Sequence, residues 1–218
     1  GHEVWDSQDI VSRNVFIKDG AQLTIEGTYG FVDNVNLNVE QGGRLIIDGG
    51  VLTSACESLW NGVDVWGDDD LCQYPASNQG FIRIVNGGKI QNAICGVQMA
   101  SVTGSTYDPE TTGGIIKCTD AIFQNNNYDV IFYPYQNLNP SSGIEAPNTS
   151  YFTNTTFIKT RASNEMRDHV TLQGIDGISF HGCSFKNEVD DLGSILSNNG
   201  IGIHSYNSGF YVDECCLN

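Results

Sequence analysis

The chain has 218 residues, with 26 acidic residues against 10 Lys and Arg and a formal net charge of −16. Its Lys and Arg residues form no cluster along the sequence, which argues against binding to nucleic acid or to an anionic membrane surface. No run of eighteen apolar residues occurs, so we expect no membrane insertion. An acidic chain of this kind is typical of a soluble secreted protein, and its carboxylates would also suit divalent cations.

One short pattern, apolar-x-apolar-x-x-small-x-apolar, recurs along the chain. Three segments fit it only in part: 23–27, 85–92 and 152–157. Four segments fit it closely: 45–52, 116–123, 178–185 and 210–217. The apolar residues alternate with period two on both sides of a two-residue break, so each copy predicts a strand, a turn and a second strand. The second apolar position marks each copy, and the markers are Ile25, Ile47, Val85, Cys118, Phe152, Phe180 and Val212.

A further strand signal follows the later copies. These segments are 63–65, 97–99, 130–132, 170–172 and 201–203. No stretch holds helical apolar spacing for three turns. Strand–turn–strand units joined by loops of variable length predict an all-β fold. The expected architecture is a right-handed parallel β-helix, a solenoid of about six or seven coils, with residues 1–218 as a single domain.

Equivalent positions in a β-helix stack from coil to coil, so the repeat predicts which residues face inward. The seven markers should form one inward row, with Cys118 buried in the core. A tight bend between sheets leaves little room for a side chain. The residues expected at this bend are Gly50, Gly88, Ala121, Thr155, Cys183 and Cys215. Asparagine can bond backbone groups at a second corner, and the candidates are Asn92, Asn125 and Asn187.

Three strings of this sequence resemble those of a known superfamily. They read Gly-x-Leu-x-Ile-x-x-Gly over 43–50, Trp-x-Gly-Val-x-Val-x-Gly over 60–67, and a glycine-containing strand ending in Ile-x-Asn-Ala over 80–93. They are similar to right-handed parallel β-helices of the pectate-lyase-like superfamily, and most similar to β-helix segments of large secreted surface proteins of the Bacteroidetes type. The resemblance implies a secreted or cell-surface location more than an activity, because the repeat carries the fold and not the chemistry.

Aromatic rings beside carboxylates and amides are the usual components of a sugar-binding site. The segment 59–70 places Trp60 and Trp66 next to three consecutive aspartates. We expect Trp60 to pack under the loop, whereas Trp66 either stacks on a ligand or covers the coil. The candidate ligand-binding residues are Trp66, Tyr74, Tyr133 and Tyr135.

The aspartates themselves are a candidate metal site. Asp68, Asp69 and Asp70 follow Gly67, which favours a loop in which their carboxylates can converge, as they could not along a strand. Calcium is the candidate ion because it prefers several oxygen ligands. The alternative is a solvated turn without an ion, and no other cofactor is expected.

The seven cysteines contain no Cys-x-x-Cys pair, so structural zinc is not expected. Cys183 occupies the small position one coil before Cys215, and adjacent coils lie about 4.8 Å apart, within the range of a disulfide. The sequence therefore suggests a disulfide from Cys183 to Cys215 or Cys216. A second candidate, Cys56–Cys72, would close the loop that carries the tryptophans and aspartates.

An enzyme on this fold would need a base or paired carboxylates on one open face. For a lyase, the candidate bases are Arg161 and Arg167. For a glycoside hydrolase, the candidates are Asp190 and Asp191 with His181. The motif strings expected of either enzyme type are absent, and His181 is better explained as an outward residue at the end of a strand.

The sequence thus favours a non-catalytic extracellular module, of cell-surface or adhesin type, that is structural or binds a glycan. The alternative is a polysaccharide lyase or glycoside hydrolase acting on acidic polysaccharide. The last copy of the repeat stops at Leu217, in mid-repeat, so we expect a segment of a larger secreted protein. Neighbouring domains or chains would then cover the open solenoid ends.

Overall fold

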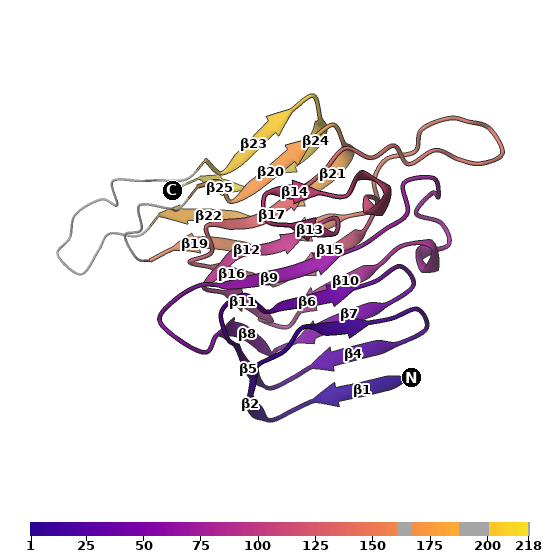
Figure 1. Cartoon of the computed structure of the whole chain (residues 1–218). Coiled ribbons are helices and arrows are strands. Elements are labelled where there is room, and N and C mark those ends of the chain that lie inside the picture. Colours follow the sequence, from indigo (N-terminus) through magenta and orange to yellow (C-terminus); the bar gives the residue numbers. More distant parts are fainter. Residues whose placement is uncertain (161–166, 188–200, 218) are drawn as a thin grey trace.

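The computed structural model describes residues 1–160, 167–187 and 201–217, and within them the strands form three parallel sheets (Figure 1). Sheet A consists of β1 (His2–Trp5), β4 (Gln22–Ile25), β7 (Arg44–Asp48), β10 (Phe81–Val85), β15 (Ile115–Thr119), β18 (Tyr151–Thr153), β21 (Asp176–His181) and β24 (Gly209–Asp213).

Sheets B and C complete each coil. Sheet B consists of β2 (Gln8–Val11), β5 (Thr28–Phe31), β8 (Val51–Ser54), β11 (Lys89–Gln91), β16 (Ile122–Gln124), β19 (Thr156–Lys159), β22 (Ser184–Asn187) and β25 (Cys216–Leu217). Sheet C consists of β3 (Val15–Ile17), β6 (Asn36–Val39), β9 (Trp60–Val65), β12 (Ala93–Gln98), β17 (Tyr128–Phe132), β20 (Val170–Gln173) and β23 (Ile203–Tyr206). The fold is a parallel β-helix.

Successive strands pass from sheet A to B to C and back, so the described residues build seven complete coils and the first two strands of an eighth. The predicted fold class and coil number are therefore confirmed. The remaining elements are a small antiparallel hairpin, β13 (Val102–Thr103) with β14 (Thr106–Tyr107), and two short 3₁₀ helices, η1 (Ala76–Asn78) and η2 (Pro109–Thr111). No helix in the described part of the chain is long and apolar enough to cross a membrane.

The inward row of sheet A runs through six of the seven predicted markers. Pairing connects Ile25 to Ile47, and later Cys118 to Phe152, Phe180 and Val212. The marker Val85 is wrong, because Ile84 pairs with both Ile47 and Cys118. The turn after β10 is one residue longer than the turn after β7. The two coils return to register at the pair Leu52 and Ile90.

Sheet C confirms the second strand signal. Its inward row passes from Leu37 through Val63, Val97, Val130 and Val170 to Ile203. The predicted strand at 201–203 begins two residues early, because pairing starts at Ile203 and Ile201 is half exposed. The core between the sheets is apolar and includes parallel stacks of phenylalanines, with Phe152 and Phe180 5.0 Å apart and Phe157 and Phe185 4.7 Å apart. Stacked rings of this kind stabilise adjacent coils.

The two predicted corners are also present. A Cβ atom on Gly50 would lie 2.5 Å from the carbonyl oxygen of Ile25, so the bend requires glycine in that coil. At the other corner, Asn92 and Asn125 both have a φ of 57°, and the Nδ2 of Asn125 donates to Thr160 Oγ1. Asn187 does not share this conformation, because it lies within the extended strand β22.

The predicted disulfides are not formed, since all seven cysteines are free thiols. Cys183 and Cys215 do lie on adjacent coils, but the Sγ of Cys215 accepts a hydrogen bond from the backbone N–H of Cys183 at 3.3 Å. Cys56 is exposed and Cys72 is half-buried, and they form no bond with each other. Cys118 is fully buried in the core, as predicted.

Candidate functional site

Three long connections lead from sheet C back to sheet A and gather along one edge of the solenoid: residues 66–80, 99–114 and 133–150 (at the right in Figure 1). Gln73 is buried and joins all three loops. Its Nε2 donates to the carbonyl oxygens of Gly113 and Gly114, and its Oε1 accepts from the backbone N–H of Thr149. A buried amide that satisfies its hydrogen bonds in this way fixes the loops relative to one another.

Gln79 performs the same task within the first loop. Its Oε1 accepts from the backbone N–H of Asp68, and its Nε2 donates to the carbonyl oxygens of Asp68 and Leu71. Gln79 is completely buried, so its hydrogen bonds anchor the aspartate turn to the protein interior.

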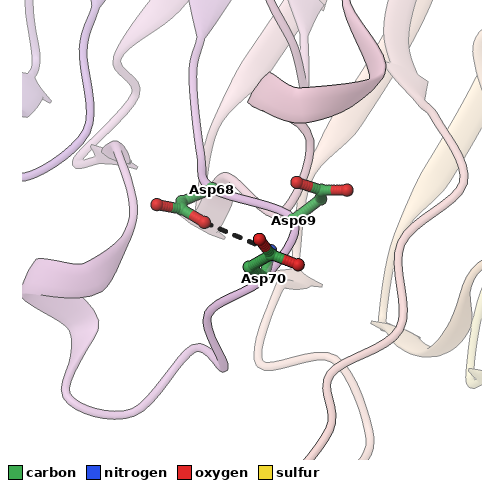
Figure 2. Close-up of side chains that lie close together, drawn as sticks. All are labelled: Asp68, Asp69 and Asp70. Atoms are coloured by element: carbon green, nitrogen blue, oxygen red, sulfur yellow. Dashed lines mark hydrogen bonds between the residues drawn. The ribbon is translucent and has the colours of Figure 1, made fainter.

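The three aspartate side chains leave this turn close together (Figure 2). One carboxylate oxygen from each of Asp68, Asp69 and Asp70 lies within 4.8 Å of the others. Asp68 also accepts hydrogen bonds from the backbone N–H of Asp70 and from Gln41. The predicted loop is thus present and its carboxylates converge, while calcium binding there stays a prediction.

The two tryptophans of segment 59–70 have different roles. Trp60 is fully buried, stacks on Phe31 with ring centroids 4.4 Å apart, and donates from Nε1 to the carbonyl oxygen of Gln91. Trp66 is half-buried and makes an edge-to-face contact with Phe16, and its Nε1 has no hydrogen-bond partner among the described residues. Trp60 is therefore a core residue, as expected, and only Trp66 remains available to a ligand.

Among the predicted tyrosines, only Tyr74 is exposed, at 86%. Tyr133 is stacked on Tyr107 at 4.3 Å and donates to Gln98 Oε1, and Tyr135 donates to the carbonyl oxygen of Leu71. Burial raises the pKa of both phenols well above the usual value, so both hydroxyls stay protonated. Ligand binding at Trp66 and the three tyrosines is untested, but the rings of Tyr133 and Tyr135 are already covered by protein.

The candidate catalytic residues do not come together in the described part of the chain. Arg161, Asp190 and Asp191 lie outside the described residues. His181 points outward, as expected, and its Nδ1 lies 3.1 Å from Asp213 Oδ2. Arg167 is placed at the corner of a coil, where its backbone N–H donates to the carbonyl oxygen of Asn127.

The outer face of sheet A carries a feature that the sequence analysis missed. Arg83 on β10 lies directly opposite Lys117 on the next coil. The guanidinium carbon of Arg44 lies 4.2 Å from the ring centroid of Phe81, and the Nζ of Lys117 lies 5.7 Å from that of Tyr151. None of these three cations forms an ion pair within the described residues. We call Arg44, Arg83 and Lys117, with Phe81 and Tyr151, the basic face.

The sequence contains a signal for this face, but the wrong register on β10 obscured it. Both Arg83 and Lys117 sit between two inward apolar residues, which places them on the outside of the sheet. Assigning the marker to Val85 instead of Ile84 shifted Arg83 to the inward side, so the two cations could not be seen as neighbours.

Two buried acids lie away from this face. Asp64 on β9 is 2% exposed and accepts from the side chains of Asn36 and Gln98 and from the backbone N–H of Val102. Desolvation raises the pKa of Asp64 from 3.8 to about 7, and these hydrogen bonds offset part of the rise. Two coils further along, Asp129 on β17 is fully buried and contacts the Nδ1 of His169.

Comparisons with known proteins add no relative. No family model matches the chain, and no curated protein or solved structure matches it. The residues and their geometry therefore carry the functional argument alone.

Proposed function

We propose that this chain is a non-catalytic extracellular module that binds an acidic polysaccharide on the outer face of sheet A. The observation that carries the proposal is the basic face. In a chain with a net charge of −16, three cations without acidic partners share one surface. Lys and Arg that lack partners are available to carboxylate or sulfate groups.

The arrangement of the face suits a polymer better than a single small anion. Arg83 and Lys117 are one coil apart, about 4.8 Å along the solenoid axis, so their charges repeat along a line. Tyr151 is only partly buried beside Lys117, and an aromatic ring can stack on the apolar face of a sugar, whereas the ring of Phe81 is covered by protein. An extended acidic chain lying along this line could contact both kinds of group.

The extracellular setting rests on the acidic composition and on the resemblance to β-helix segments of large secreted Bacteroidetes-type surface proteins. In that setting the solenoid would act as a rigid rod of cell-surface or adhesin type, extended at its ends by neighbouring units. Support comes from Val212, which lies in the inward row of sheet A and is still 50% exposed. At the opposite end, Glu3 and Asp9 occupy inward rows, which disfavours simple head-to-tail stacking of identical chains.

The test is binding of the full chain to polygalacturonate, alginate and heparin, with neutral dextran for comparison. We expect the double variant Arg83→Ala/Lys117→Ala to bind the acidic polymers about tenfold more weakly, a change of ~1.4 kcal/mol. Binding of the unchanged protein should also weaken as salt is added, because exposed charges are screened.

A matched control removes the same two charge types elsewhere. Arg13 and Lys18 are exposed and lie outside the basic face, so Arg13→Ala/Lys18→Ala should leave affinity nearly unchanged. Equal losses in both double variants would indicate a general charge effect and refute the proposed face. Release of unsaturated or reducing-end products during the same incubations would instead establish the enzyme alternative, a polysaccharide lyase or glycoside hydrolase.

A further inference from the structure

A pocket of about 640 Å³ opens beside the long loops, and no residue of the basic face lines it. It lies where the first and third long loops meet the short turns after β20 and β23. Its volume is within the range of small-molecule sites. The polar and aromatic side chains that line it are Asp69, Asp70, Tyr135, Gln136, Gln173, Tyr206 and Asn207.

The charge of the lining restricts the ligand. Asp69 and Asp70 contribute two carboxylates, and the lining contains no Lys, Arg or His. Neither carboxylate forms an ion pair within the described residues. An anionic sugar would therefore be repelled, and the acidic polymer proposed for the basic face does not fit this pocket.

The neutral groups of the pocket are free to bind. Gln136, Gln173 and Asn207 line the pocket, and the side-chain amides of these residues have no hydrogen-bond partner in the parts of the chain that the structure describes. Each amide offers two N–H donors and a carbonyl acceptor. Together with two carboxylate acceptors, they match the mixed donors and acceptors of neighbouring sugar hydroxyls.

The pocket lining also includes exposed apolar surface. Tyr206 is 74% exposed and Leu138 is 43% exposed, and both line the pocket. An exposed tyrosine ring is a platform on which the C–H face of a sugar ring can stack. Tyr206 was not among the residues that the sequence pointed to.

The pocket is also held rigid. Tyr135 is buried in its wall and donates to the carbonyl oxygen of Leu71, beside the aspartate turn. The backbone N–H of Gly174 donates to the carbonyl oxygen of Tyr206, which fixes the turn on the opposite side. A site whose walls are already fixed loses little conformational entropy on binding.

From these features we infer that the pocket binds an uncharged saccharide, stacked on Tyr206 and hydrogen-bonded by the free amides and the carboxylates of Asp69 and Asp70. This second site is independent of the proposed basic face, because the two share no residue.

In the experiment, the full chain is titrated with methyl glycosides of glucose, galactose, mannose and N-acetylglucosamine. Binding is detected by saturation-transfer NMR. Glucuronic acid and glucosamine serve as the anionic and cationic probes. We expect at least one neutral glycoside to bind, with little salt dependence and with no effect of a chelator. Tyr206→Ala and Gln173→Ala should each lower that affinity, Tyr206→Ala by about tenfold or more.

The matched control is Tyr211→Ala, which removes another exposed tyrosine, 67% exposed, that does not line the pocket. It should leave neutral-sugar binding unchanged, as should Arg83→Ala/Lys117→Ala. The inference is overturned if no neutral glycoside binds, if glucosamine alone binds, or if Tyr206→Ala and Tyr211→Ala have equal effects. Sugar binding abolished by the chelator would overturn the direct contact in favour of a metal-bridged one.

Discussion

Asp64 should make this protein less stable as the pH rises from acid to neutral, which is the reverse of the usual effect of a carboxylate. The side chain is 2% exposed, under the hairpin β13–β14. Burial raises its pKa from 3.8 to about 7. Between these two values the folded chain holds a proton that the unfolded chain has lost, so folding becomes less favourable with each step in pH.

The size of the effect follows from the same two values. A difference of about three pH units corresponds to about 4 kcal/mol, at ~1.4 kcal/mol per unit. The stabilisation by the protonated form is complete below pH 4 and is lost by the time the pH exceeds about 7. Asp64→Asn removes the titrating group and keeps the shape of the side chain. Relative to the unchanged protein, the free energy of unfolding of the variant should therefore rise by up to ~4 kcal/mol at pH 8 and by little near pH 4.

The measurement is urea unfolding at several pH values between 4 and 8, monitored by tryptophan fluorescence. Trp60 and Trp66 bracket Asp64 in sequence and report on the same coil. The exposed Asp6 provides the control, since Asp6→Asn should leave the pH dependence in place. Parallel stability curves for the unchanged protein and Asp64→Asn across this range would refute the reasoning.

Three further predictions test the core, the loops and the thiols, and one tests the metal. Phe152→Ala should destabilise the fold by about 3–5 kcal/mol in urea unfolding, because the ring is fully buried between neighbouring coils. Gln73→Leu should cost about 1–3 kcal/mol for each buried group left unpaired, and hydrogen exchange should speed up in all three long loops. In the native protein Cys56 and Cys216, both exposed, should react first with a thiol reagent, and all seven thiols should react after unfolding. If the turn at Asp68–Asp70 binds calcium, added calcium should raise the melting temperature and a chelator should reverse it, whereas no shift would favour a solvated turn.

Much of the fold could be predicted from local pattern alone. Period-two alternation with a small residue three positions after the marker placed Ile25, Ile47, Cys118, Phe152 and Phe180 in one inward row. The pattern works because each strand of a solenoid has an inward and an outward side, and burial rewards apolar residues only on the inward side. The same reasoning identified the bend at Gly50 as one that excludes a side chain.

The pattern failed where one residue changes the register. An extra residue in the turn after β10 moved the inward position from Val85 to Ile84. The spacing to Gly88 favoured Val85, whereas the local signal for Ile84 was Arg83, which faces inward if Val85 does. Similarly, the expected exposure of Tyr133 and Tyr135 depended on what covers them. Tyr107 and the carbonyl oxygen of Leu71 come from other loops, and the chain alone does not say which loop folds over which.

By itself, the sequence determined that this protein is a parallel β-helix and which side of most strands faces the core. Only the tertiary structure decided where functional groups meet. It brought Arg83 beside Lys117 from the next coil, and it set Asp69 and Asp70 around one pocket with Tyr206. The physical reason is that the coils differ in length. Neighbours across coils are fixed by backbone pairing and by the packing of variable loops, and neither leaves a constant spacing in the sequence.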